Sequence, residues 1–348
     1  MTGSKCTHRF PSLFLVLLPA IILFSQMPAS AQVLQFDSLG TVTAKTIACP
    51  SQGLPATACY ALDVSCPSIS NYTVYLKTFV PASSPRGVVT LTPGGTSTQL
   101  FEEYAYGSVT VEELLSARFL AVEITFGGPF NDNEKGWQTN VNGAGPRAAS
   151  CRYATVTQWI KNKLASQVPL CAAALSAGSQ QIAEGLAHYG LSQYLAFAEL
   201  GSGPPFTRAD EACIPSHNQS VEYCSGIDIG MDVGVANAQN YIDPAYPGSW
   251  CSQDIETGSS LHQAQFLSDS VTSPDALLNY PSTTVWFLYG GLDNSSAINQ
   301  GESYRLNIKT ANRAGCVPDA PHSLASVLSG AQQIANDMSL QCRFPKHH

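Results

Sequence analysis

The stretch Leu170-Cys-Ala-Ala-Ala-Leu-Ser-Ala-Gly-Ser179 decides the fold of this protein. Its first six residues form a short apolar run that predicts a buried strand, and residues 178–189 show the apolar spacing of a helix. Gly190 follows as the glycine that commonly ends a helix. Ser176 therefore stands at the junction between a strand and a helix.

The rest of the chain repeats this alternation. Strands are predicted over residues 61–64, 72–80, 87–92, 119–125, 194–200 and 284–289, and helices over 146–165 and 323–340. Strands that alternate with helices predict an α/β fold whose mostly parallel central sheet has helices on both faces. Residues 201–280 are predicted to be irregular, and the stretch 207–280 within them suggests an insertion. Functional groups in such folds gather beyond the carboxyl ends of the strands.

The N-terminus has the order of a secretory signal. Lys5 and Arg9 precede or border an apolar run over residues 10–24, and Ala29-Ser-Ala31 follows. The run is shorter than the roughly 20 apolar residues that span a bilayer, so an uncleaved anchor is the less favoured alternative. The predicted organisation is a signal peptide (1–31), an N-terminal strand region (32–86), an α/β core (87–206), a cap-like insertion (207–280) and a C-terminal part of the core (281–348).

Charge is scarce and mainly acidic. Charged residues form 12% of the chain, about half the share usual in globular proteins. Loss of residues 1–31 would remove Lys5 and Arg9 and change the formal net charge from −8 to −10. An acidic chain without clusters of Lys and Arg is a poor partner for nucleic acid or an anionic membrane. We therefore expect a secreted or periplasmic protein that binds neither nucleic acid nor, once its signal is removed, the membrane.

Cysteine usage agrees with export. Cys6 lies in the predicted signal, and the even number that remains predicts disulfides. Cys213 with Cys224 is the favoured local pair, and Cys171, in a buried strand, is a possible free thiol. Their spacing does not suit zinc. Three N-x-S/T sequons begin at Asn71, Asn218 and Asn294.

The five residues Ala174-Leu-Ser-Ala-Gly178 predict a nucleophile. A serine on a tight turn between strand and helix needs small residues two positions to either side, and the turn exposes its hydroxyl above the sheet. The backbone N–H of Ala177, at the start of the helix, would donate to an oxyanion. The alternative for Ser176 is an ordinary helix-capping serine. Ser179 is the competing nucleophile, but its place in the first helical turn favours a structural role.

A second oxyanion donor is expected from Pro93-Gly94-Gly95, which follows the strand at 87–92. Glycines let the backbone approach a substrate closely. An ordinary turn is the alternative interpretation. We predict that Gly94 and Gly95 contribute to the oxyanion hole together with Ala177.

The predicted base is His322, in Ala320-Pro-His322, on a loop before the last helix. A neutral imidazole can take the proton of a serine and return it to the leaving group. Asp293, which follows the strand at 284–289, is the predicted acid that orients the imidazole, and Asp319 is the alternative. Asn294 starts a sequon beside Asp293, and we expect it to carry no glycan. The remaining internal histidines are expected to be structural or to lie in the insertion: His188, His217 and His262.

These motifs resemble those of the α/β-hydrolase superfamily, over about residues 85–340. They also resemble a group of exported, cysteine-rich members in which Ser-Ala-Gly-Ser-Gln (residues 176–180) precedes Ala-His-Tyr-Gly-Leu (residues 187–191). The resemblance implies hydrolysis of an ester, thioester or peptide bond by the chain-order triad Ser, Asp, His. It implies no cofactor and no metal, and it does not single out a substrate.

Three functions remain open at this point. The first is a secreted serine esterase that acts on a small-molecule or polymer acyl substrate. The second is a catalytically silent binding protein on the same scaffold, and the third is a serine peptidase of aminopeptidase type. Four aromatic residues could line a pocket, but the simpler interpretation is that they pack in the core or in loops: Phe130, Trp137, Phe206 and Trp250. The sequence leaves the oligomeric state open.

Overall fold

The computed structural model describes residues 35–128, 130, 136–214, 218–224, 227–232 and 238–344, without the side chains of 218–223 and 227–232. The chain divides into a unit of residues 1–35, of which only Gln35 is described, and a unit of residues 36–348, described below. The predicted signal peptide and the candidate histidine His217 lie outside the described residues.

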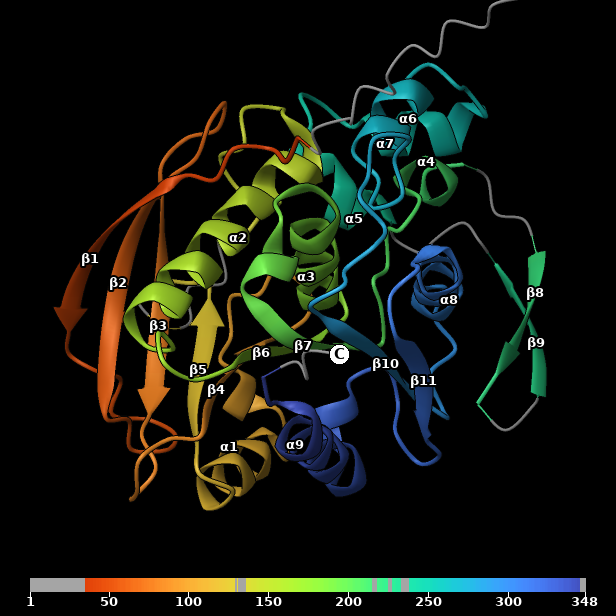
Figure 1. Cartoon of the computed structure of the whole chain (residues 1–348). Helices are drawn as coiled ribbons and strands as arrows, with labels where there is room; N and C mark the ends of the chain where they lie inside the picture. The colour runs from red at the N-terminus through yellow and green to blue at the C-terminus, as the bar shows by residue number, and fades with distance from the viewer. Residues whose placement is uncertain are drawn as a thin grey trace, which may run out of the picture. The chain divides into compact units, whose positions relative to one another are not determined.

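A nine-stranded sheet organises the second unit, in the order β1-β2-β3-β5-β4-β6-β7-β10-β11 (Figure 1). The pairs β1–β2, β2–β3 and β3–β5 are antiparallel, and the five remaining pairs are parallel. The strands are β1 Thr41–Ile47, β2 Ala58–Ser65, β3 Tyr72–Phe79, β4 Gly87–Thr92, β5 Phe119–Thr125, β6 Leu170–Leu175, β7 Leu195–Gly201, β10 Thr284–Gly290 and β11 Asn312–Val317.

Helices cover both faces of this sheet: α1 and α9 lie on one face, and α2 and α3 on the other (Figure 1). The helices are α1 Gly107–Ser116, α2 Gly145–Lys163, α3 Ala177–His188, α4 Ala209–Ala212, α5 Ala238–Ile242, α6 Trp250–Thr257, α7 Gln263–Ser268, α8 Ala297–Asn307 and α9 Leu328–Gln341. None of the helices in the described part of the chain is long and apolar enough to cross a membrane.

Strand β6 shows why the central strands are apolar throughout. Its side chains alternate between the two faces, so Ala172 and Ala174 join the core beneath α2 and α3, whereas Cys171, Ala173 and Leu175 join the core beneath α1 and α9. All six residues of β6 are buried. The small alanines let both helical layers approach the sheet closely.

The predicted strands and helices of the core are confirmed, within one to three residues of the observed bounds for most of them. The helix predicted over 323–340 is wrong at its start: a 3₁₀ turn covers Leu324–Ser326, and α9 begins only at Leu328. The turn leaves His322 on a loop outside any helix.

The prediction that residues 201–280 are irregular is also wrong. This segment contains α4 to α7 and a hairpin of β8 (Asn218–Tyr223) with β9 (Ile227–Asp232). Each of these helices has at most eight residues, which is too short for a helical period to stand out. Strands β1 and β11 were missed because they lie at the sheet edges, where most of their side chains are exposed or half-buried.

Five disulfides join the ten remaining cysteines: Cys49–Cys59, Cys66–Cys151, Cys171–Cys342, Cys213–Cys251 and Cys224–Cys316. The predicted pair Cys213–Cys224 is therefore wrong, because the insertion folds back on itself and brings Cys251 to Cys213. Cys171 is not free, since it pairs with Cys342 at the end of α9. Proximity in space, and not along the chain, decides these pairs.

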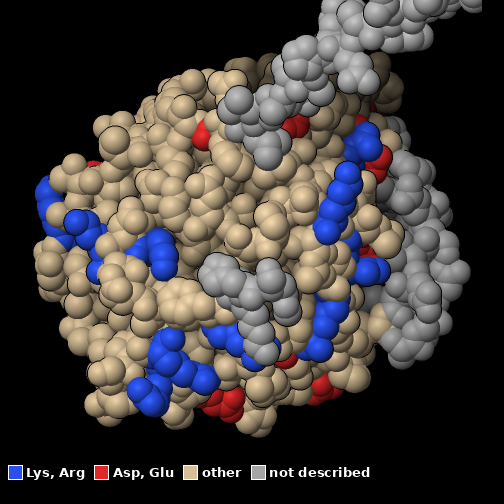
Figure 2. All heavy atoms as spheres, viewed as in Figure 1, with Lys and Arg blue, Asp and Glu red and all other residues tan. Residues whose placement is uncertain are grey.

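The surface carries few charges, as the composition indicates. On the face seen in Figure 2, Lys and Arg side chains form separate groups with wide uncharged areas between them.

Two buried carboxyl groups meet between β7 and α9, those of Glu199 and Asp337. Burial first, and then the neighbouring Asp337 carboxylate, raise the pKa of Glu199 well above its ordinary value, and Arg313 opposes the shift.

Removal of the Cys171–Cys342 disulfide should destabilise the fold more than removal of Cys49–Cys59. The first closes a loop of 171 residues and the second a loop of 10, and chain entropy favours the longer cross-link. The Cys224–Cys316 disulfide lies within the longer loop and shortens its effective length. We therefore expect the variant with both Cys171 and Cys342 replaced by alanine to be about 2 kcal/mol less stable than the variant with both Cys49 and Cys59 replaced. Urea unfolding measures the two unfolding free energies, and equal losses would contradict the prediction.

Glu199→Gln should gain stability relative to the wild type as the pH rises. The raised pKa of folded Glu199 means that its stabilising contribution is complete below the unfolded pKa of about 4.3 and declines as pH rises toward the folded pKa. Glutamine removes this dependence, so the difference should grow by up to about 1.4 kcal/mol per pH unit. Urea unfolding at pH 5 and pH 8 tests this. The control is Glu112→Gln, because Glu112 on α1 is exposed; its stability relative to the wild type should not rise with pH in this way.

Candidate active site

Ser176 occupies the tight turn between β6 and α3. Its backbone has φ 49° and ψ −117°, a region that residues with a side chain seldom adopt, and such strain is often found at functional sites. The turn is held at the sheet by the Ser176 N–H, which donates to the Gly201 carbonyl at 2.7 Å. Within residues 169–192, all of which the structure describes, every residue is buried except Ser176. The fold thus turns this one hydroxyl outward.

Close contact between α3 and the end of β4 imposes this turn. A Cβ atom at Gly178 would lie 2.6 Å from the Pro93 carbonyl oxygen and 2.8 Å from that of Thr92. The same atom would lie 3.1 Å from the Cβ of Ala174. The small side chain of alanine at position 174 therefore fits, but a larger side chain would not.

Ser179 is held inside the protein. It is fully buried, and its hydroxyl lies 3.0 Å from the Ala174 carbonyl oxygen and 2.9 Å from that of Gly201. These bonds join the first turn of α3 to the ends of β6 and β7. Its contacts agree with the structural role that the sequence suggested.

The loop after β4 lies beside Ser176 and is fixed by hydrogen bonds. The Ser97 hydroxyl donates to the Pro93 carbonyl at 2.9 Å, and the Gln181 side chain of α3 donates to the Ser97 hydroxyl at 2.9 Å. A Cβ atom at Gly94 would lie 3.0 Å from the Cβ of Ser176. The loop is therefore in contact with the serine and bound to the same helix.

The two glycines of this loop differ. The Gly94 N–H donates to the Tyr104 hydroxyl at 3.0 Å, so this amide already has an acceptor within the protein. Gly95 has φ +60°, which favours glycine, and no heavy atom lies within 4 Å of the position where its Cβ would be. Burial raises the pKa of Tyr104, so its hydroxyl keeps its proton. The backbone near Gly95 has open space beside it.

The structure brings His322 and Asp293 into contact. The His322 Nδ1 atom lies 2.9 Å from Asp293 Oδ2, and the Ser295 hydroxyl lies 3.1 Å from the same nitrogen. The Asp293 side chain is fully buried, and that of His322 is 38% exposed. The Ser295 N–H donates to the other carboxylate oxygen of Asp293 at 2.9 Å. A proton on Nδ1, shared with the carboxylate, leaves Nε2 as the acceptor nitrogen.

Parallel pairing of β10 with β11 positions both residues. The loops that follow these strands are joined by the Gly291 N–H, which donates to the Val317 carbonyl, and by the Leu292 N–H, which donates to the Ala320 carbonyl. A Cβ atom at Gly290 would lie 2.4 Å from the carbonyl oxygens of Ala320 and Pro321. Glycine at this position allows the two loops to touch.

Ser176 and His322 line one cavity of about 480 Å³. Its wall is formed by residues from the loop after β4, from the end of β6, from α5 and from the His322 loop. These residues are Gly94, Gly95, Thr96, Thr98, Gln99, Tyr104, Leu175, Ser176, Tyr241, His322 and Ser323. Among the described residues that line it there is no Asp, Glu, Lys or Arg. Asp293 is not one of these lining residues, but it is hydrogen-bonded to His322, which is.

The other histidines and the alternative acid lie elsewhere. His188 is buried, with Nε2 3.2 Å from Glu184 and 3.1 Å from the Ser270 carbonyl. The His262 ring stacks on Trp250. Asp319 is exposed and accepts a hydrogen bond from the Ser329 hydroxyl, so it does not face His322.

The aromatic residues weighed from the sequence pack rather than line this cavity. Trp137 and Phe206 are buried, Phe130 lies against Tyr75, and Trp250 is stacked between other rings. The cavity instead contains Tyr104 and Tyr241, which the sequence analysis missed. No local motif marks either of them, because the insertion and the segment before α1 reach the site only through the tertiary fold.

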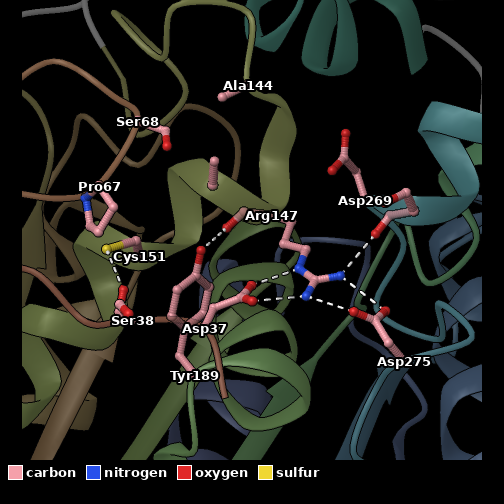
Figure 3. Close-up of a pocket in the computed structure, with 12 residues that line it drawn as sticks. Asp37, Ser38, Pro67, Ser68, Ala144, Arg147, Cys151, Tyr189, Asp269 and Asp275 are labelled. Carbon is pink, nitrogen blue, oxygen red and sulfur yellow. Dashed lines mark hydrogen bonds and ion pairs between the residues drawn. The ribbon is translucent and has the colours of Figure 1, made fainter. Parts of the chain in front are cut away.

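A second cavity, of about 510 Å³, lies around Arg147 on α2 (Figure 3). The guanidinium forms hydrogen bonds with both carboxylate oxygens of Asp37, both of Asp275 and the Ser268 carbonyl. These five bonds use all five of its N–H donors. This arginine therefore joins three distant segments and has no donor left for an anion.

The described residues contain no group of His, Cys, Asp and Glu that could hold a metal ion.

No family model matches this sequence, and no curated protein matches it. Among solved structures, the chain is similar to acetyl xylan esterase 1 from Thermoanaerobacterium sp. JW/SL YS485, with a TM-score of 0.51 and 12% identity over 87% of this chain and 88% of that one. It is also similar to Est1E from Butyrivibrio proteoclasticus (TM-score 0.47, 12% identity, 81% and 98% covered) and to an alpha-beta serine hydrolase homologue from Coxiella burnetii (0.46, 9%, 82% and 100%). The sheet, its helices and the likeness to acetyl xylan esterase 1 identify the α/β-hydrolase fold.

Gly178→Ala should destabilise the protein, although alanine is normally the better helix residue. The added methyl group would meet two backbone carbonyl oxygens that cannot easily move, and overpacking of this kind costs about 1–3 kcal/mol. Gly315→Ala in β11 is the control, because its methyl group would meet the flexible side chain of Leu288 at 3.3 Å and a backbone oxygen, that of Phe287, only at an ordinary contact distance of 3.9 Å. Urea unfolding should show a loss for the first variant that clearly exceeds that of the second; equal stabilities would contradict the tight contact.

Proposed function

We propose that this protein is a secreted serine hydrolase that cleaves an ester or related acyl bond by a Ser176-His322-Asp293 triad, through an acyl-enzyme. The observation that carries the proposal is a shared cavity: the outward-turned Ser176 lines it together with His322, whose Nδ1 is bonded to a buried carboxylate. Nucleophile, base and orienting acid are the parts that acyl transfer by serine requires.

In the first half of the reaction, the Ser176 hydroxyl oxygen attacks the carbonyl carbon while Nε2 of His322 takes the hydroxyl proton. The tetrahedral oxyanion accepts hydrogen bonds from backbone N–H groups. When the intermediate collapses, the bond to the leaving alcohol breaks and His322 gives its proton to the alcohol oxygen. The Asp293 side chain, bonded to Nδ1, stabilises the imidazolium.

In the second half, water replaces the alcohol. His322 takes a proton from the water while the water oxygen attacks the acyl carbon. The second tetrahedral intermediate then breaks its bond to the Ser176 oxygen and releases the carboxylic acid. The proton then returns to the Ser176 oxygen. The enzyme ends in its starting state, and one ester and one water have become one acid and one alcohol.

The oxyanion donors can be narrowed from the three that the sequence suggested. The Ala177 N–H is in the first turn of α3, where backbone donors have no partner within the helix. The Gly95 N–H belongs to a residue with open space beside it, whereas the Gly94 N–H is bonded to Tyr104. We therefore assign oxyanion stabilisation to Ala177 and Gly95, and assign to Gly94 the anchoring of the loop.

Two further features support parts of this proposal, namely export and an ester substrate. Five disulfides favour an oxidising compartment and therefore export. The cavity wall contains no carboxylate, among the described residues, that could bind the free amino group of an aminopeptidase substrate. An ester is thus favoured over an aminoacyl amide.

A fluorophosphonate probe should label the wild-type protein, and Ser176→Ala should abolish the labelling because the probe reacts with an activated serine hydroxyl. Asp293→Asn should slow labelling by about a thousandfold or more, since it favours the wrong tautomer of His322. Gel fluorescence after timed reaction measures both rates.

Ser179→Ala is the matched control. It should keep a folded circular dichroism spectrum, and the probe should still label it. Wild-type protein that stays unlabelled would contradict the enzyme and favour a binding protein on this scaffold. Hydrolysis of aminoacyl anilides without hydrolysis of aryl esters would instead favour the peptidase.

A further inference from the structure

The described residues that line the Ser176 cavity are mainly polar, and none of them is Asp, Glu, Lys or Arg. Their side chains offer hydroxyl and amide groups, from Thr96, Gln99, Tyr241 and Ser323 among others, and His322 and the tyrosines are the titratable side chains in this set. Among the described residues that line the cavity, Leu175 has the one aliphatic side chain, and this residue is 2% exposed. A ligand in this cavity therefore meets mainly hydrogen-bonding groups and little aliphatic surface.

This wall restricts the acyl group. A long acyl chain binds by removing its methylene groups from water onto apolar surface. Leu175, the one aliphatic side chain among the described residues of this wall, is almost fully buried and offers little surface of that kind. The cavity volume of about 480 Å³ must also hold the alcohol part of an ester. The acyl group that fits best is short, of the size of an acetyl group.

The same wall is suited to an alcohol with many hydroxyl groups. Thr96 is exposed and Gln99 half-buried on the loop after β4, so their polar atoms can reach a ligand. Both can donate and accept hydrogen bonds, as sugar hydroxyls do. Because none of the described residues of this wall carries a charged side chain, a phosphorylated or carboxylated alcohol is disfavoured: its charge would lose hydration without gaining a partner among them.

Tyr241 adds an aromatic face to this wall. It comes from α5 in the insertion, its side chain is 39% exposed, and its ring lies against buried Phe206, with ring centroids 6.4 Å apart. The Phe206 N–H donates to the Gln180 side chain of α3, which connects Tyr241 to the helix that begins after Ser176. A positioned, partly exposed ring with a polar tip can pack on the C–H face of a sugar ring and bind its hydroxyls.

We propose that the substrate is a short-chain acyl ester of a polyhydroxylated alcohol, such as an acetylated sugar, and that Tyr241 is a specificity-determining residue that binds the sugar part. This inference rests on the proposed hydrolase function. It adds to it the class of both substrate halves.

Three esters test the proposal. They are 6-O-acetylglucose, cyclohexylmethyl acetate, which replaces the sugar by a ring of similar size without hydroxyls, and 6-O-octanoylglucose, which lengthens the acyl chain. We expect kcat/KM for 6-O-acetylglucose to exceed that for each of the other two by about ten-fold or more, the effect of one or two hydrogen-bonded contacts. Release of acid, followed by titration, measures all three.

Tyr241→Ala should raise KM for 6-O-acetylglucose by about ten-fold and reduce its advantage over cyclohexylmethyl acetate. Tyr106→Ala is the matched control, because Tyr106 is 40% exposed but lies outside the residues that line the cavity. It should keep the wild-type preference between the two acetates.

The outcomes separate the two proposals. Equal rates on the two acetates, faster cleavage of the octanoyl ester, or an unchanged preference in Tyr241→Ala would overturn the substrate assignment. Fluorophosphonate labelling of Ser176 in the same preparation would then leave the hydrolase function standing. If labelling also fails, the hydrolase function falls, and the substrate assignment falls with it.

Discussion

The close approach of α3 to the end of β4 is the constraint on which the site depends. With Gly178 against the carbonyl oxygens of Thr92 and Pro93, the chain has no room for a gradual turn after β6. Ser176 must therefore reverse direction within one residue, at positive φ. That reversal turns its hydroxyl away from the core and places the first amides of α3 beside the loop that follows β4.

The second half of the site depends on a different pair of strands. Parallel pairing of β10 and β11 brings two loops side by side, and a glycine at position 290 lets them touch. Asp293 is thereby buried under His322, while the imidazole stays partly exposed at the cavity. The carboxylate is desolvated yet bonded to the Ser295 N–H and to His322, so it can orient the ring.

Local sequence predicted most of the core. Apolar runs such as 119–125 and 170–175 are buried on both faces of the sheet, and burial on both faces leaves a signal that can be read without knowing the neighbours. Edge strands β1 and β11 and the short helices of residues 201–280 leave no such signal. The same distinction holds at the site: Ser176, Asp293 and His322 stand in motifs, whereas Tyr104 and Tyr241 do not.

The sequence by itself determined the central strands, the turn at Ser176 and the residues that could serve as nucleophile, acid and base, because each depends on a few neighbours along the chain. Only the tertiary structure decided which cysteines pair, which glycine amide of the loop after β4 is already bonded, and which side chains surround the serine. These depend on contacts between segments that are far apart in sequence. Cys213 meets Cys251, Gly94 meets Tyr104, and a short helix of the insertion brings Tyr241 to the cavity, through packing that no local pattern encodes.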